Sequence, residues 1–190
     1  ALMRTIPGMT IISPADADEA YAAVEAAINF YGPVYMRFGR FPVPNLTPEI
    51  KDYRFEIGRG VTYREGRDVT IVATGYMVHL AVEAADILAK EGIDAGVINI
   101  HTVKPLDTAL ITEAAKRSGA IVTAEEHTVI GGLGAAVCEA LAESCPVPVL
   151  RVGVEDQYGR SGKVPELLEL YGLTAENIAA KARLAVSLRK

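Results

Sequence analysis

Blocks of apolar residues recur along the chain from residue 68 onward, and their length and spacing predict the secondary structure. Short runs rich in β-branched residues predict strands at 68–74, 95–100, 120–125 and 147–153. These runs lack polar alternation, which indicates strands that are buried on both faces. We therefore expect a mostly parallel sheet with helices on each side.

Stretches with helical periodicity separate these strands. Between 77 and 92, apolar residues recur at helical spacing and end at a glycine. Asp107 is typical of a helix N-cap and Gly119 of a helix end, so we expect them to bound a second helix. Further helices are predicted at 134–144, 164–172 and 174–189. Strands begin roughly every 25 residues, which is the length of one βα unit.

The first part of the chain contains one smaller βαβ unit. The segments 10–13 and 33–38 predict strands on either side of a helix at 16–30. In that helix, Asp16 and Glu19 have the spacing of a capping box. A single βαβ unit is too small to form a domain alone.

A proline-rich stretch follows this unit. Three prolines between 42 and 58 indicate a linker, and 59–65 then predicts another strand. The 190 residues suffice for one domain and part of a second. We therefore expect the end of one α/β domain, a linker and one complete α/β domain.

Composition and charge exclude several classes of protein. Half of the residues are hydrophobic and 23% are charged, as in a folded globular chain. The formal charge is −5 and the pI is near 5.3, which argues against nucleic-acid binding. No apolar run approaches the ~18 residues of a membrane span, and the start of the chain lacks the pattern of a signal peptide. Cys138 and Cys145 are too far apart along one helix to pair, so we expect reduced thiols and a cytoplasmic protein.

A glycine-rich stretch, EEHTVIGGLGAAV at 125–137, lies where a predicted strand leads into a predicted helix. Backbone amides at a helix N-terminus can hold an anion. The stretch matches neither GxGxxG nor GxxxxGKS/T, and a tight strand-to-helix turn explains its glycines without a ligand. Glu125, Glu126 and His127 stand at the carboxyl end of the strand, where open α/β sheets bind ligands.

Histidine and arginine side chains are the remaining candidates for chemistry. His101 follows a strand end, as His127 does, so the two could share one crevice. No metal-binding spacing and no nucleophile context is present, so we predict neither a metal site nor acyl transfer. Arg37 and Arg40 end a strand, where a guanidinium can bind a phosphate through two parallel N–H groups. Surface charges beside an exposed loop explain these arginines equally well.

Several segments together resemble transketolase-type thiamine-diphosphate enzymes. They are LMRTIPGMTIISPADADEA, GPVYMRFGR, DVTIVATGYMV, HTVKPLD and VTAEEHTVIGGLGAAV, and the likeness continues to YGRSGKVPELLELYGLTAENI near the end. The chain is most similar to the separate C-terminal transketolase subunit of archaea and bacteria. The resemblance implies an α/β fold: a three-layer α/β/α C-terminal domain at 59–190 with a mostly parallel five-stranded sheet. Residues 1–45 would be the last βαβ of the pyrimidine-binding domain, and 46–58 the linker.

The resemblance also implies a cofactor and partners. The parent enzyme would use thiamine diphosphate and Mg²⁺, but its GDG motif and its catalytic glutamate lie outside this sequence. We therefore expect no cofactor, metal or catalytic residue for this chain alone. Arg37 matches the arginine that binds the sugar phosphate, and the candidates for interdomain or ligand contacts are Arg40, His101, Glu126 and His127. The expected partners are an N-terminal transketolase subunit or domain and, in the parent enzyme, a second copy in a homodimer.

The resemblance thus implies the C-terminal portion of a transferase that moves a two-carbon ketol unit between sugar phosphates. Alone, this portion would be inactive. Deoxyxylulose-phosphate synthase and the β subunit of a 2-oxoacid dehydrogenase share this domain and remain alternatives. A free-standing regulatory module that binds a ligand near His101 and His127 is a third alternative.

Overall fold

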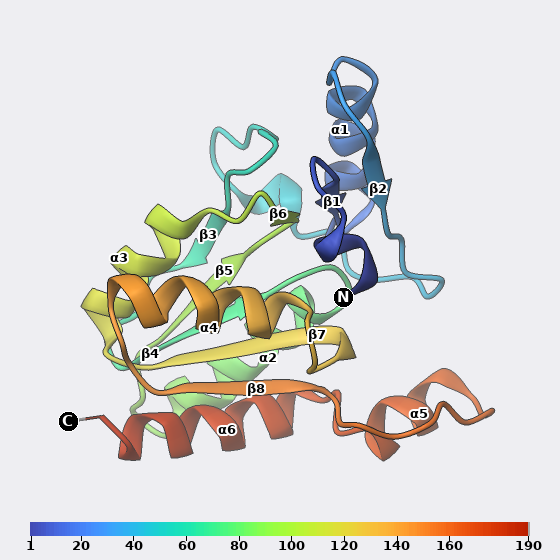
Figure 1. Cartoon of the computed structure of the whole chain (residues 1–190). Helices are drawn as coiled ribbons and strands as arrows, with labels where there is room; N and C mark the ends of the chain where they lie inside the picture. The colour runs from blue at the N-terminus through green and yellow to red at the C-terminus, as the bar shows by residue number, and fades with distance from the viewer. Residues whose placement is uncertain (190) are drawn as a thin grey trace.

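The computed structural model describes residues 1–189, and these form two β-sheets and six α-helices (Figure 1). The N-terminal part begins with a short 3-10 helix, η1 (Leu2–Thr5). It continues with β1 (Thr10–Ile12), α1 (Ala17–Ile28) and β2 (Val34–Met36). Because β1 and β2 are parallel neighbours, the predicted βαβ unit is confirmed.

A five-stranded sheet forms the core of the remaining chain. Its strands are β3 (Val61–Arg64), β4 (Val69–Ala73), β5 (Ala95–Asn99), β7 (Ile121–Thr128) and β8 (Val149–Val154). They lie in the order β3-β5-β4-β7-β8, and all are parallel except β3, which runs antiparallel to β5. Every residue of β4 and β5 is buried, as their unbroken apolar sequences predict.

Two pairs of helices cover the faces of this sheet (Figure 1). α2 (Met77–Lys90) and α6 (Ala175–Ser187) pack on one face, and α3 (Thr108–Ser118) and α4 (Leu133–Ser144) on the other. The predicted three-layer α/β/α fold with a mostly parallel sheet is therefore confirmed. α5 (Val164–Leu170) projects from these layers. Within residues 1–189, none of the helices is long and apolar enough to cross a lipid bilayer.

The ends of α3 show how local sequence sets the limits of an element. The Asp107 side chain accepts a hydrogen bond from the backbone N–H of Leu110 at 3.1 Å. At the other end, Gly119 has a left-handed backbone with φ +66°, which favours glycine. Both predicted boundaries of this helix are confirmed.

The segment HTVKPLD, which follows a predicted strand, contains a third strand of the N-terminal sheet. β6 (Thr102–Lys104) pairs antiparallel with β1, with Ile11 opposite Lys104 and Ile12 opposite Thr102. The strand order is β2-β1-β6. Three residues carry too little periodicity to predict a strand, and the partner strand lies far away in the sequence. The two parts of the chain therefore share one sheet.

Glu19 joins the N-terminal unit to the C-terminal domain. The capping box is only half formed: Asp16 accepts from the Glu19 N–H at 3.0 Å, while the Glu19 carboxylate, fully buried, turns elsewhere. It accepts hydrogen bonds from Ala15 N at 2.6 Å, Tyr53 Oη at 2.7 Å and Asn99 Nδ2 at 2.8 Å. Burial raises the pKa of Glu19, and these hydrogen bonds oppose that shift. One carboxylate thus connects α1, the stretch before β3, and the end of β5.

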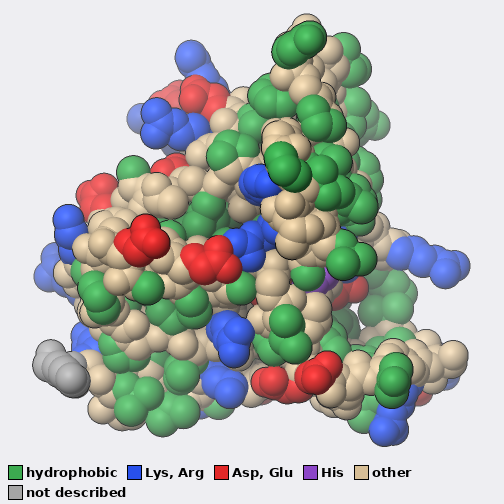
Figure 2. Space-filling model, in the orientation of Figure 1, with side chains coloured by type: hydrophobic (Ala, Val, Ile, Leu, Met, Phe, Trp, Pro, Cys, Tyr) green, Lys and Arg blue, Asp and Glu red, His purple; other side chains and the backbone are tan. Residues whose placement is uncertain are grey.

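Hydrophobic side chains gather over α1 and β2 on the outside of the N-terminal unit (Figure 2). Tyr21, Ile28 and Tyr31 are 80%, 78% and 102% exposed. Among the described residues, β2 is also an edge strand. An apolar face beside an unpaired strand edge is typical of a surface that another polypeptide segment covers.

Candidate functional site

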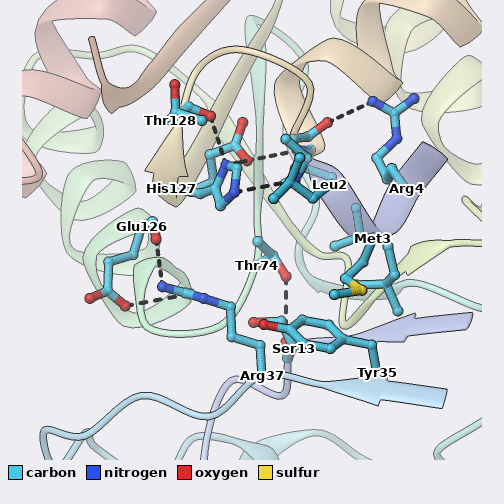
Figure 3. A pocket seen from close by; sticks show the side chains of 16 residues that line it. Leu2, Met3, Arg4, Ser13, Tyr35, Arg37, Thr74, Glu126, His127 and Thr128 are labelled. Atoms are coloured by element: carbon cyan, nitrogen blue, oxygen red, sulfur yellow. Dashed lines mark hydrogen bonds and ion pairs between the residues drawn. The ribbon is translucent and has the colours of Figure 1, made fainter. Parts of the chain in front are cut away.

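A pocket of about 400 Å³ lies between the N-terminal sheet and the carboxyl end of β7 (Figure 3). One wall consists of η1 and residues of β1 and β2, and Glu125–Thr128 form another. Thr74, which directly follows β4, and the start of α4 complete the lining. The parallel strands β4 and β7 both end here, so the pocket occupies the edge at which open α/β sheets bind ligands.

Arg37 extends into this pocket from the end of β2 (Figure 3). Its backbone N–H donates to Ile12 O at 2.8 Å, which fixes the residue at the end of the N-terminal sheet. Its guanidinium Nη2 donates to the backbone oxygen of Glu126 at 2.8 Å. Nη1 lies 3.6 Å from Glu126 Oε2, and both side chains are about one-third exposed. The structure thus brings together Arg37 and Glu126, two residues that the sequence identified separately.

Glu125 explains the glycine-rich turn. Its carboxylate is 3% exposed and accepts hydrogen bonds from the backbone N–H of Leu133 at 2.7 Å and of Gly134 at 2.8 Å. These are amides of the first turn of α4, so a carboxylate of the chain itself occupies the anion-binding end of the helix. A Cβ on Gly132 would collide with that carboxylate. The stretch is therefore the expected tight turn, and the structure leaves no phosphate cradle at its amides.

His127 lines the pocket beside Arg37 and Glu126. Its Nδ1 lies 2.9 Å from Thr128 O, so this nitrogen carries the proton and donates to the carbonyl. Its Nε2 lies 3.2 Å from the nitrogen of Ala1. The hydrogen bond to Thr128 O fixes the orientation of the ring, whose Nε2 faces the start of η1.

Arg4 is a pocket residue that the sequence analysis missed. Arg4 lies in η1 and lines the pocket. Its Nη1 donates to Gly131 O at 2.9 Å, and its Nη2 forms an ion pair with the carboxylate of Glu139 on α4. Lys104 Nζ in turn donates to Arg4 O at 2.8 Å. These contacts fasten η1 to the C-terminal domain. They join residues that are distant in the sequence, and no local motif marks them.

His101 does not share the pocket with His127. Its side chain is completely buried, and its ring stacks on Phe55 with 4.2 Å between centroids. Nδ1 lies 3.0 Å from Thr102 Oγ1, while Nε2 has no hydrogen-bond partner within the described chain. Burial lowers the pKa of His101 to about 4. Its position is that of a packed core residue at the junction of β5 and β6.

The stability of the protein should fall below neutral pH because His101 must stay uncharged in the fold. Its pKa of about 4 lies below the ordinary 6.5, so the neutral ring stabilises the fold above pH 6.5, and this contribution is lost as the pH falls toward 4. From pH 7 to pH 5, we expect the unfolding free energy of the wild type to drop by about 2 kcal/mol more than that of His101→Gln. Urea unfolding at both pH values measures the difference. Equal losses in the two proteins would contradict it.

Arg40 also lies away from the pocket. It is exposed on the loop after β2 and borders a separate hollow with Lys163 and Val164 at the start of α5. Of the two arginines in YMRFGR, only Arg37 therefore reaches the carboxyl end of β7.

The described residues do not fit thiamine diphosphate with its metal ion. Among residues 1–189, no group of three or more His, Cys, Asp or Glu side chains could hold a metal ion. The one buried carboxylate in the pocket, Glu125, is already bonded to the backbone of α4. No step of a cofactor-dependent reaction can be assigned to this chain's own side chains.

Comparisons with known proteins agree with this architecture. Residues 58–178 match the family model of the transketolase C-terminal domain, and residues 1–44 match that of the transketolase pyrimidine-binding domain. A 6-deoxy-6-sulfo-D-fructose transketolase subunit from Clostridium sp. (strain MSTE9) is 47% identical over 182 residues, which cover 96% of this chain and 56% of the relative. The 1-deoxy-D-xylulose-5-phosphate synthase of Heliobacterium modesticaldum is 44% identical over 184 residues, covering 96% of this chain and 28% of that enzyme.

A solved structure shows the same fold. A protein described as a split-gene transketolase, inactive β4 tetramer, superposes with a TM-score of 0.93 at 49% identity, over 100% of this chain and 61% of the other. The chain thus spans little more than half the length of these subunits. With one family model matched over most of the chain and a second over its start, the chain belongs to the transketolase family.

Proposed function

We propose that this chain is the C-terminal portion of a transketolase that moves a two-carbon ketol unit between sugar phosphates. The observation that carries the proposal is the position of Arg37 in the pocket at the carboxyl end of β7. A guanidinium there can bind the phosphate of a sugar through parallel N–H groups. In this reading, residues 1–45 belong to the pyrimidine-binding domain, 46–58 are the linker, and 59–190 form the C-terminal domain.

The proposed activity requires a second polypeptide segment. Thiamine diphosphate and Mg²⁺ would be bound by an N-terminal subunit or domain, and this chain alone would be inactive. The exposed apolar face of α1 and the free edge of β2 are the proposed contact surface for that segment. Relatives named as transketolase subunits support this division. We further propose a homodimeric parent enzyme in the cytoplasm.

A synthase of 1-deoxy-D-xylulose 5-phosphate is the second candidate. It is favoured by the 44% identity to the Heliobacterium enzyme, which approaches the 47% identity to the Clostridium subunit. Both reactions involve phosphorylated sugars, so Arg37 would serve the same purpose in each. The two enzymes use different donor and acceptor substrates, so an activity assay distinguishes the two candidates.

Because the chain spans little more than half the length of the related subunits, the test combines the full-length subunit that contains it with an N-terminal transketolase subunit from the same source. With thiamine diphosphate and Mg²⁺ present, we expect ketol transfer from a ketose phosphate to an aldose phosphate only when both chains are present. Product formation from pyruvate and glyceraldehyde 3-phosphate instead would establish the synthase. Calorimetric titration of the cofactor and Mg²⁺ into this chain alone should give no heat of binding. Tight saturable binding would contradict the assignment of the cofactor site to the other chain.

A further inference from the structure

We propose that Glu126 competes with the substrate's anionic group for Arg37 and thereby sets the affinity of the site for phosphorylated sugars. This inference rests on the proposed function, because it concerns the arginine that would bind the sugar phosphate. It assigns to Glu126 the role of a positioning residue that acts through Arg37.

The geometry around Arg37 carries the inference. The guanidinium has two contacts with the same residue: Nη2 with the backbone oxygen of Glu126 at 2.8 Å, and Nη1 with its carboxylate at 3.6 Å. Figure 3 shows both contacts between the guanidinium of Arg37 and Glu126. A phosphate that binds through the parallel N–H groups of Nη1 and Nη2 would lie beside this carboxylate. The carboxylate and the phosphate would then lie close together with like charges.

Two other residues of the pocket that could meet an anion, Arg4 and His127, already bond to groups of the described chain. Arg4 binds Gly131 O and the Glu139 carboxylate. His127 donates its Nδ1 proton to Thr128 O. Arg37 remains the cation best placed to meet an anion in the pocket. Removing the negative charge beside its guanidinium should therefore strengthen anion binding directly.

The two contacts of Glu126 can be separated experimentally. The backbone oxygen holds the guanidinium whatever the side chain at 126 is, so Glu126→Gln removes the negative charge and leaves the stronger tether of Arg37 in place. The Glu126 side chain is about one-third exposed and is not a core residue, so the variant should fold. Glu126→Gln is therefore a test of charge at nearly constant geometry.

We expect Glu126→Gln in the reconstituted enzyme to lower KM for phosphorylated sugars about three- to tenfold, with a smaller change in kcat. This is the effect of removing one like charge about 5 Å away in a partly solvated site. KM for an unphosphorylated sugar should stay constant, and Glu126→Asp should restore the wild-type KM. In the Arg37→Ala background, Glu126→Gln should give no further gain.

Glu143→Gln is the matched control, since it removes an exposed carboxylate of α4 that neither lines the pocket nor pairs with Arg4 or Arg37. Its KM for phosphorylated sugars should equal that of the wild type. An unchanged KM in Glu126→Gln, or the same decrease for unphosphorylated sugars, would overturn the inference alone. A wild-type complex without turnover of any sugar phosphate would overturn the proposed function, and the inference with it.

Discussion

Replacing Arg37 by alanine should raise KM for phosphorylated sugars in the reconstituted enzyme by about 10- to 100-fold. The estimate corresponds to the loss of charge-assisted hydrogen bonds worth about 1.5–3 kcal/mol. The guanidinium stands in the pocket, while its backbone is fixed by the hydrogen bond to Ile12. Steady-state kinetics with phosphorylated and unphosphorylated sugars measure the effect, which should be confined to the phosphorylated ones.

Arg40→Ala is the control for this measurement. Arg40 has the same charge, lies three residues further along, and borders a different hollow next to Lys163. Its removal should leave KM unchanged. If Arg40→Ala gave the larger increase, the phosphate site would lie in that second hollow, and the assignment of Arg37 would be wrong. The melting temperature of each variant separates lost binding from lost stability.

The largest effect on stability should come from Glu19→Leu, which we expect to lower the unfolding free energy by about 3–5 kcal/mol. A leucine fills a similar volume but leaves Ala15 N–H, Tyr53 O–H and the Asn99 amide without their acceptor. Each buried donor left unpaired costs about 1–3 kcal/mol, and the three are not fully additive. Denaturant unfolding monitored by circular dichroism measures the change.

Glu25→Leu provides the comparison on the same helix. Glu25 is exposed on α1, and its replacement should change the unfolding free energy by no more than about 0.5 kcal/mol. Similar losses of unfolding free energy in the two variants would mean that replacing any glutamate of α1 destabilises the protein. The hydrogen bonds of Glu19 would then contribute little to the joint between the two parts of the chain.

Sequence patterns correctly predicted the elements whose signals lie within a few neighbouring residues. The buried strands β4 and β5 have continuous apolar sequences, and the N-cap at Asp107 and the left-handed glycine at 119 act within one helical turn. Such signals are complete within a few residues. The five-stranded sheet was expected from the resemblance to a family, and the order of its strands was not predicted.

Long-range pairing accounts for what the sequence did not reveal. Glu19 has the spacing of a capping residue, but its carboxylate turns toward Tyr53 and Asn99, which local reasoning could not identify. His101 follows a strand end, as ligand-binding residues often do, yet it packs against Phe55 in the interior. In both cases a tertiary contact decides the role of a residue whose local context fits another.

The candidate site was predictable in part. The sequence analysis selected three residues from strand ends: Arg37, Glu126 and His127. The structure places all three around one pocket, because the ends of β2 and β7 both border that pocket. The ion pair between Arg37 and Glu126 could not be predicted, since it depends on how the two sheets meet. Arg40 was selected by the same reasoning as Arg37, and only the path of the loop separates them.

The pairing of β6 with β1 has a consequence for the exchange of parts between related enzymes. Thr102–Lys104 lie within the C-terminal domain in sequence, but they form an edge strand of the preceding sheet. A hybrid joined between residues 44 and 58, where the two family models meet, would therefore import a foreign edge strand together with the new domain. A stable hybrid needs residues along β1 and β6 that match each other. A junction chosen from domain boundaries alone does not ensure this match.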